Sequence, residues 1–297
     1  MLWIVAVLRA TDTTTGAMNF DISLKAFGYQ FIGYGGMVNS QSFESRAVLV
    51  TGAGSSSGIG FSSAKALGAL GYRVGITSTT DRIWDRVREL EALGIDTFGF
   101  IADLTVEERA NELVAEFIAR FDTLDVLVNN AGMRSVATSF ETEHGALESY
   151  STNSWHKAIA RNIDTTMLVT KAAMPFIKLS SAGRVINVSS TTGPVVVIRE
   201  NVGYATAKSA LIGFTRAVAL DYAHFPVTVN AVAPGWIATS IESDDEALQG
   251  EATPMKRSGT PEEVASAIVW LASVGASYIT GQCIVIDGGN SLPEERA

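Results

Sequence analysis

A glycine-rich turn near residue 50 constrains the fold of this chain more than any other feature of the sequence. The apolar run Ala47 to Val50 leads into the turn Thr51 to Gly60, and an amphipathic segment follows from Phe61 to Leu70. A strand, a glycine turn and a helix in this order form the context that a dinucleotide-binding fingerprint requires. Such a turn is a weak signal alone, so the rest of the chain must support it.

Strand-like runs alternate with helix-length segments after the turn. The runs are Ala47 to Val50, Arg73 to Thr77, Thr97 to Ala102, Val126 to Asn129, Arg184 to Val188, Val227 to Val232 and Cys283 to Ile286. This alternation implies βαβ crossovers, so we expect an α/β fold: a Rossmann-type doubly wound parallel sheet of about seven strands with helices on both faces. The run at Cys283 is expected to be a buried strand. Thr260-Pro261-Glu262-Glu263 predicts a capping box that opens a helix through Leu271.

The N-terminal residues 1–45 differ from the rest because they show no sustained period of 2 or 3.6. We expect them to form a poorly ordered extension, and residues 46–297 to form a single dinucleotide-binding catalytic domain. The apolar stretch Leu2 to Leu8 is too short to cross a bilayer, which takes ~20 residues. It also lacks the basic start of a secretory signal, so a cytoplasmic location is expected.

Composition excludes several classes of function. The net charge is −9 and no basic run is present, which disfavours binding to nucleic acid or to anionic membranes. The three histidines are scattered and Cys283 is the only cysteine, so neither a metal site nor an internal disulfide is expected.

Tyr204 and Lys208 are four residues apart and project from the same face of a predicted helix. A free phenol titrates near ~10, and a neighbouring ammonium favours the phenolate, which makes Tyr204 a usable general acid and base. The pair is common on solvated helices. Its position downstream of Ser190 and of the glycine turn is what favours catalysis.

Together these motifs resemble the short-chain dehydrogenase/reductase family from about Arg46 to Gly289. Thr51-Gly52 with Gly58-Ile59-Gly60 is similar to its cofactor turn, and Asn129-Asn130-Ala131-Gly132 to its central-strand motif. Pro234 to Thr239 resembles the segment that holds the nicotinamide. The end of the chain, from Tyr278 to Gly289, is similar to the 3-oxoacyl-[acyl-carrier-protein] reductase branch and its alcohol dehydrogenase relatives.

The resemblance implies a catalytic tetrad of Asn162, Ser190, Tyr204 and Lys208. Tyr204 would exchange a proton with the carbonyl oxygen, and Ser190 would hydrogen-bond that oxygen. Lys208 would bind the nicotinamide ribose as well as bias Tyr204 toward ionisation. Asn162 would hold a water through which protons reach Lys208.

The same resemblance, with the end of the second strand, gives the expected cofactor contacts. They are Gly52, Ser56, Ser57, Gly58, Ile59, Gly60, Ser78, Thr79, Thr80, Arg82, Asp103, Leu104, Asn130, Ala131, Gly132, Tyr204, Lys208, Pro234, Gly235, Ile237 and Thr239. Ser78 stands where NAD-preferring enzymes carry a carboxylate for the ribose hydroxyls. The hydroxyls of Ser78, Thr79 and Thr80, with Arg82 nearby, suit a 2′-phosphate and so favour NADP(H). Asp81 is close enough in sequence to keep NAD(H) possible.

Several departures from the family pattern bear on the substrate. The glycine turn has five residues between Thr-Gly and Gly-x-Gly, Ala53 to Ser57, where three are usual, and Arg134 to Ser154 forms an enlarged flap. The usual lid, between Thr239 and Pro254, is short and acidic. Phe225 stands where carrier-protein reductases commonly carry an arginine. An acyl-carrier-protein substrate is therefore possible but less favoured than a small carbonyl or alcohol.

The leading hypothesis is an NADP(H)-dependent reductase that converts a ketone or 3-oxoacyl group to a secondary alcohol. The alternative is an NAD-dependent dehydrogenase of a sugar, polyol or other secondary alcohol. A nucleotide-sensing protein without chemistry is disfavoured because all four tetrad residues are present. The resemblance also implies a homotetramer assembled through Trp155 to Ile177, Tyr204 to Tyr222 and the last strand.

Overall fold

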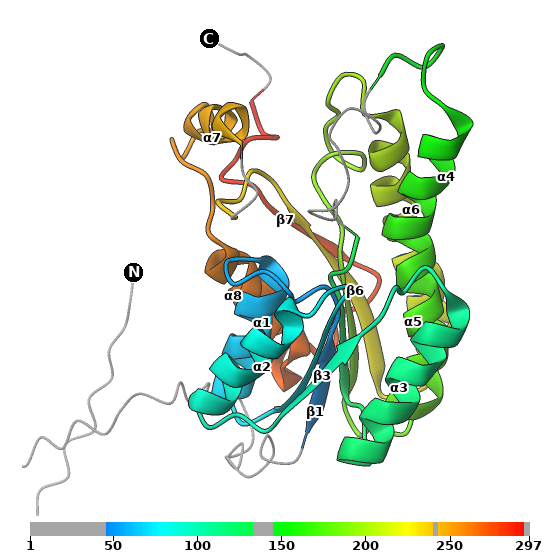
Figure 1. Ribbon diagram of the computed structural model, residues 1–297. Coiled ribbons are helices and arrows are strands. Elements are labelled where there is room, and N and C mark those ends of the chain that lie inside the picture. Colours follow the sequence, from blue (N-terminus) through cyan, green and yellow to red (C-terminus); the bar gives the residue numbers. More distant parts are fainter. Residues whose placement is uncertain (1–45, 133–144, 240–242, 294–297) are drawn as a thin grey trace, which may run out of the picture. The chain divides into compact units, whose positions relative to one another are not determined.

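A parallel sheet with the strand order β3-β2-β1-β4-β5-β6-β7 organises the computed structural model (Figure 1). The structure describes residues 46–132, 145–239 and 243–293, so the predicted N-terminal extension and most of the predicted flap lie outside the described residues. The strands are β1 (Ala47–Val50), β2 (Arg73–Ser78), β3 (Thr97–Ile101), β4 (Val126–Asn129), β5 (Gly183–Val188), β6 (Val227–Pro234) and β7 (Cys283–Ile286). The expected doubly wound sheet is confirmed, with differences of one or two residues at some strand ends.

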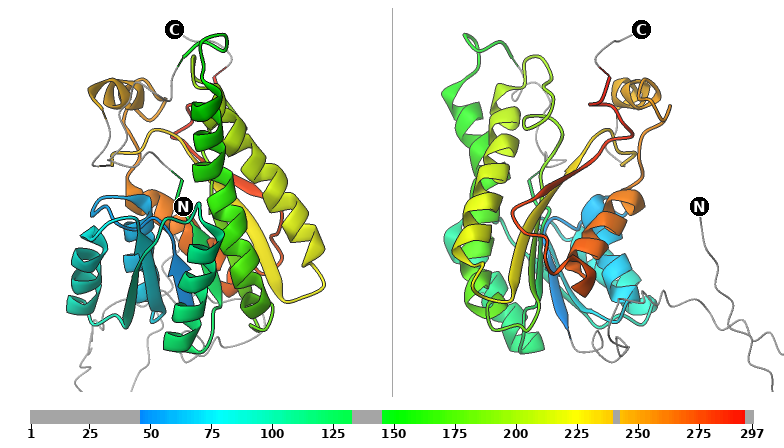
Figure 2. Two further views of the ribbon diagram at one scale, coloured as in Figure 1. Left: turned by 45° about the vertical axis from the view of Figure 1, so that its right-hand side comes forward. Right: turned by 180° about the vertical axis from the view of Figure 1, so that it is seen from behind.

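Helices cover both faces of this sheet (Figure 2). They are α1 (Ile59–Ala69), α2 (Arg82–Ala92), α3 (Glu107–Phe121), α4 (Thr152–Ile159), α5 (Thr165–Ile177), α6 (Val202–Asp221), α7 (Asp244–Glu251) and α8 (Pro261–Ala272), with a π-helical turn η3 (Ala160–Asp164) and a 3-10 turn η4 (Val274–Ala276). In the view from behind, α1 and α8 lie on one side of the sheet and α5 and α6 on the other.

Strand alternation divides the core into two clusters, one on each face. Val48 and Val50 of β1 pack with side chains of α1, α2 and α8, whereas Ala47 and Leu49 pack with side chains of α3, α5 and α6. Successive residues of a strand point to opposite faces, so one short apolar run supplies both clusters. The sheet is thereby buried on both sides, as parallel sheets require.

The strand order reverses between β1 and β4, because β2 lies on one side of β1 and β4 pairs with its other side. In doubly wound folds the crevice at such a switch point, outside the carboxyl ends of the strands, is where ligands bind. This crevice lies at the glycine turn that follows Val50.

Capping boxes fix the starts of two helices. Thr260 and Glu263 form the predicted box at α8, where the Thr260 side chain accepts a bond from the Glu263 N–H. A second box, Ser243 with Glu246, opens α7, which lies within the short acidic stretch. Asp244, Asp245 and Glu246 occupy the first turn of α7, where carboxylates stabilise the positive end of the helix dipole. Three of the acidic residues in this stretch therefore stabilise the start of a helix.

Two predictions were wrong: the burial of the strand at Cys283 and the end of the flap. Cys283 is only partly buried and Val285 is 41% exposed, because β7 is the edge strand and pairs with β6 alone. The predicted flap ends too late, since Thr152 to Ser154 belong to the first turn of α4 and Ser151 caps that helix by accepting from the Ser154 N–H.

Among the described residues, no helix combines the length and apolar character needed to cross a bilayer.

Gly75 offers a direct test of the packing between β2 and α3. A Cβ at this position would lie 2.5 Å from two ring atoms of the fully buried Phe117. We expect Gly75→Ala to lower the free energy of unfolding by about 1–3 kcal/mol, since overpacking displaces a ring that has no space to move. Urea denaturation checks this.

Gly213 of α6 is the matched control, because a Cβ there meets nothing within 4 Å. Gly213→Ala should keep or raise stability by up to about 1 kcal/mol through helix propensity. A Gly75→Ala protein as stable as the parent would contradict the described packing.

Candidate active site

A cleft of about 220 Å3 opens at the carboxyl ends of β1, β2, β3 and β4. Twelve of the predicted cofactor residues line it: Gly52, Gly58, Ile59, Ser78, Thr79, Arg82, Asp103, Leu104, Asn130, Ala131, Gly132 and Thr239. These twelve residues come from five separate segments of the chain, which meet at one place. This is the crevice expected at the switch point.

Close backbone packing shapes the wall formed by the glycine turn. Gly52 has a φ of +68°, and a Cβ there would lie 2.8 Å from the Cα of Ala131. A Cβ on Gly60 would lie 2.5 Å from Asn130 Nδ2. Any side chain at these two positions would push the turn away from the end of β4.

Hydrogen bonds between Thr51 and Asn130 hold the same two walls together. Thr51 Oγ1 accepts from the N–H groups of Asn130 and Ala131, both at 3.0 Å. Asn130 Nδ2 donates to the carbonyl oxygens of Thr51 (3.1 Å) and Gly52 (2.9 Å). The Asn-Asn-Ala-Gly motif therefore acts by fastening the end of β4 to the turn.

The turn fits the pyrophosphate of a dinucleotide. Helix α1 begins at Ile59, and its first turn, Ile59 to Ser62, contains no carboxylate. The first N–H groups of a helix lack partners within it and attract an anion together with the helix dipole. Of the three serines in the longer turn, Ser55 lines the cleft, whereas Ser56 and Ser57 are not part of its lining.

Polar groups that fit a ribose or its phosphate gather at the end of β2. Ser78 Oγ donates to the carbonyl oxygen of Thr80 at 2.7 Å, and Arg82 Nε donates to Thr80 Oγ1 at 3.2 Å. A Cβ built on Gly54 would lie 2.8 Å from the Cβ of Ser78, so the longer turn rests directly against this residue. The corner offers hydroxyls and one guanidinium.

Asp103, which follows β3, lines the cleft. Its Oδ1 accepts from the Thr105 N–H (3.0 Å) and from Thr105 Oγ1 (2.7 Å), which organises the turn before α3. The same residue lines the cleft, so Asp103 both organises this turn and faces the cavity.

Lys208 is the most constrained member of the predicted tetrad. Its side chain is buried, its Nζ donates to the carbonyl oxygen of Val188 at 3.0 Å, and Nζ lies 5.6 Å from the centre of the Tyr204 ring. Burial lowers the pKa of Lys208 from 10.5 to about 8, because the charged form loses its hydration. The ammonium form still predominates at neutral pH and lies beside the phenol.

The other two members of the predicted tetrad, Ser190 and Asn162, lie just beyond a strand and within a helical turn, respectively. Ser190 follows β5 and its Oγ accepts from the Thr192 N–H at 3.1 Å. Asn162 lies buried in the π-helical turn, where its Nδ2 donates to the carbonyl oxygen of Ala158 at 3.0 Å. Its buried Oδ1 has no partner among the described residues. Turns of this kind occur often at functional sites.

The segment predicted to hold the nicotinamide is fastened to the loop before α8. The N–H of Ala238 donates to the carbonyl oxygen of Gly259 (2.8 Å), and the N–H of Gly259 donates to that of Trp236 (2.9 Å). This pairing presents Thr239 to the cleft. Pro234, by contrast, is the last residue of β6, which runs two residues further than predicted because Pro234 pairs with Ile286.

The structure does not place every predicted contact in the cleft. Those outside its lining are Ser56, Ser57, Gly60, Thr80, Tyr204, Lys208, Pro234, Gly235 and Ile237. Residues that sequence reasoning missed are Gly54, Ser55, Thr77, Ala102, Thr105, Arg161 and Thr165. Gly54 and Ser55 were within the recognised turn. No sequence signal pointed to Arg161 or Thr165, because they face the cleft only through the packing of the α4–α5 region on β4.

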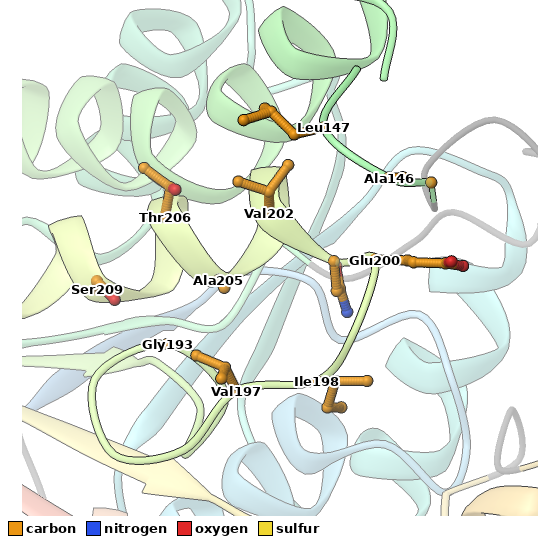
Figure 3. Close-up of a pocket in the computed structure, with 12 residues that line it drawn as sticks. Ala146, Leu147, Gly193, Val197, Ile198, Glu200, Val202, Ala205, Thr206 and Ser209 are labelled. Carbon is orange, nitrogen blue, oxygen red and sulfur yellow. The ribbon is translucent and has the colours of Figure 1, made fainter. Parts of the chain in front are cut away.

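A second cavity, of about 500 Å3, lies beside the N-terminal half of α6 (Figure 3). Helix α6 contributes Val202, Ala205, Thr206 and Ser209, which follow the spacing of one helix stripe, and the 193–201 loop and Leu147 complete the wall. None of the four predicted tetrad residues belongs to its described lining. None of the four belongs to the lining of the first cleft either. In the described part of the chain, no cluster of three or more metal-ligating side chains occurs.

Comparison with known proteins agrees with this geometry. A family model described as enoyl-(acyl carrier protein) reductase matches residues 52–291. The 3-oxoacyl-[acyl-carrier-protein] reductase of Aquifex aeolicus is 36% identical over 252 residues, which cover 83% of this chain and 97% of that protein. A variant of the actinorhodin polyketide ketoreductase, solved with NADPH, has a TM-score of 0.76 at 29% identity over 85% of this chain and 99% of its own. The aldohexose dehydrogenase of Thermoplasma acidophilum gives 0.74 at 29% identity over 86% and 97%.

The buried lysine predicts a pH-dependent stability. Folded Lys208 releases its proton near pH 8, while the unfolded chain keeps it to about pH 10, so the unfolded state binds more protons between these values and stability rises with pH. Relative to Lys208→Met, the parent should gain about 2 kcal/mol in free energy of unfolding between pH 7 and pH 9.5. Denaturant titrations of both proteins at the two pH values measure the gain. An equal change in both would show that Lys208 titrates normally.

Proposed function

This chain belongs to the short-chain dehydrogenase/reductase family of NAD(P)-dependent oxidoreductases acting on CH–OH and C=O groups, and we propose that it reduces a ketone or 3-oxoacyl group to a secondary alcohol with NADPH. The observation that supports this most directly is the burial of Lys208 with its ammonium beside the Tyr204 ring. A cation held next to a phenol in a poorly hydrated place favours proton transfer by that phenol.

In the proposed reaction, Tyr204 donates its phenolic proton to the carbonyl oxygen of the substrate. Ser190 hydrogen-bonds the same oxygen and stabilises the negative charge that develops there. Lys208 stabilises the phenolate left on Tyr204, and Asn162 holds a water that returns the proton. A bound nicotinamide would supply the hydride, held by the cleft residues described above.

The preference for NADPH is supported by the corner at the end of β2. Ser78 carries no charge, Gly54 presses against it, and Arg82 supplies a cation at the rim of the cleft. A guanidinium is well suited to a phosphate, whereas a carboxylate at Ser78 would suit the two ribose hydroxyls of NAD. The related ketoreductase was solved with NADPH, which is consistent with this choice.

A small carbonyl compound is favoured over a substrate attached to a carrier protein. Phe225 packs against His224, with ring centres 4.2 Å apart, and against Tyr222, so an aromatic cluster occupies the position where carrier-protein reductases commonly have an arginine. The first turn of α7 is acidic and would repel a polyanionic partner. The similarity to a 3-oxoacyl reductase keeps the 3-oxoacyl group in the substrate class.

The alternative remains an NAD-dependent dehydrogenase of a sugar, polyol or other secondary alcohol. It is supported by Asp81, which directly precedes α2 beside the ribose corner, and by the structural similarity to an aldohexose dehydrogenase. Initial rates with a panel of ketones, including an aliphatic α-diketone, and of alcohols and sugars, each with both cofactors, separate the two functions.

We also propose a homotetramer, which the sequence predicted by resemblance. Apolar side chains exposed on the predicted faces, such as Met167 of α5, Leu220 of α6 and Val285 of β7, supply surface that association would bury. The predicted cytoplasmic location stays a prediction.

The role of Tyr204 can be tested by removing its hydroxyl. Tyr204→Phe keeps the ring but loses the proton donor, so kcat should fall by about 10²–10⁴-fold while NADPH affinity changes little. Steady-state kinetics and cofactor fluorescence titration measure the two effects. Residual activity within tenfold of the parent would contradict the role.

The cofactor preference can be tested at Ser78. Ser78→Asp places a negative charge where we propose the 2′-phosphate binds, so the ratio of kcat/KM for NADPH to that for NADH should fall at least tenfold. Ser78→Ala, which removes the hydroxyl without adding charge, serves as the control and should change the ratio much less. A parent protein that already prefers NADH would refute the assignment.

A further inference from the structure

Asn187 of β5 and Ser189, the residue directly after this strand, make buried polar contacts with α6. Ser189 Oγ donates to the carbonyl oxygen of Lys208 at 2.8 Å, and Asn187 Nδ2 donates to Thr215 Oγ1 at 2.9 Å. Asn187 and Ser189 are two residues apart, and the N–H of Ser189 still donates to the carbonyl oxygen of Val232 in β6, so both side chains point to the same face of the sheet. Lys208 and Thr215 are seven residues apart, on the same stripe of the helix. All four side chains are at least 96% buried.

A third contact runs in the opposite direction. Lys208 Nζ donates to the carbonyl oxygen of Val188, the residue before Ser189. The end of β5 and helix α6 therefore exchange hydrogen bonds: the Ser189 side chain reaches the helix backbone, and the Lys208 side chain reaches the backbone of the last strand residue. Any slide of α6 along β5 would break both bonds.

The same contacts extend to the helix that follows the Asn162 turn. Asn129 Nδ2 of β4 donates both to Asn187 Oδ1 and to Thr170 Oγ1 of α5, each at 2.9 Å. Polar groups thus connect α5, β4, β5 and α6 within an otherwise apolar layer. Apolar contacts are non-directional and permit small slides between a helix and a sheet, whereas buried hydrogen bonds have a narrow geometry and are costly to leave unmade.

We propose that Ser189 and Asn187 are positioning residues that set the register of α6 on β5. Ser190 follows Ser189 directly, and Tyr204 lies one helical turn before Lys208. The register therefore decides whether the Tyr204 phenol and the Ser190 hydroxyl reach the same carbonyl oxygen. This inference rests on the catalytic roles proposed above for Tyr204, Lys208 and Ser190.

Three variants test the proposal: one for the Ser189 contact and two for the Thr215 contact. Ser189→Ala removes the first donor, and Thr215→Val removes the hydroxyl of the second contact while preserving the shape of the side chain. We expect each to lower kcat at saturating NADPH and substrate at least threefold and to displace the alkaline limb of the kcat–pH profile. Thr215→Ser keeps the hydroxyl and should restore the parent kcat and profile.

Ser180→Ala is the matched control for lost stability. Ser180 Oγ is also buried and donates to Asp125 Oδ1, but it lies before β5, at the opposite end of that strand from Ser190. Its loss should lower Tm and leave kcat and the pH profile unchanged.

The result that would overturn the proposal is a Ser189→Ala protein with a Tm lowered as in Ser180→Ala and a kcat within threefold of the parent. If Ser189→Ala does not fold, the Thr215 pair decides by the same criterion. Tyr204→Phe is assayed in parallel: if it is inactive while Ser189→Ala and Thr215→Val keep the parent kcat, only the positioning inference is wrong. If Tyr204→Phe is itself active, the proposed function fails and this inference fails with it.

Discussion

The close approach of the glycine turn to the end of β4 is the contact on which the cofactor cleft depends. Gly52 and Gly60 leave no space for a Cβ against Ala131 and Asn130, and the Asn130 side chain bonds the carbonyl oxygen of Gly52. The contact lies at the reversal of strand order, so it places the start of α1 beside the ends of β1 and β4. A phosphate can then meet free helix N–H groups at the place where the sheet opens.

A second constraint is the burial of a cation, which opposes folding but suits the chemistry. Placing Lys208 out of water lowers its pKa to about 8, and its bond to Val188 compensates only part of the lost hydration. The same burial keeps the ammonium near Tyr204, where a hydrated lysine would be screened. The burial that destabilises the fold at Lys208 is therefore the same feature that the proposed proton transfer uses. The polar contacts between the end of β5 and α6 hold Lys208 in this position.

Much of the fold could be predicted because its signals are local. The apolar runs that became β1, β4 and β7 have the expected bounds, and Thr260 with Glu263 forms the expected capping box. The burial of β7 could not be predicted, since an edge strand and a central strand have the same apolar pattern. The helix α7 was hidden for a different reason: its acidic first turn resembles a solvated lid, although the same carboxylates stabilise a helix start.

The sequence by itself determined the βαβ succession, the family and the candidate residues Tyr204, Lys208 and Ser190, because periodicity, glycine spacing and a four-residue interval are properties of neighbouring residues. Only the tertiary structure decided that Ser55, and not Ser56 or Ser57, lines the cleft, and that Lys208 is buried. These outcomes depend on how distant segments pack, and no local pattern encodes the depth or the neighbours that packing gives to a side chain.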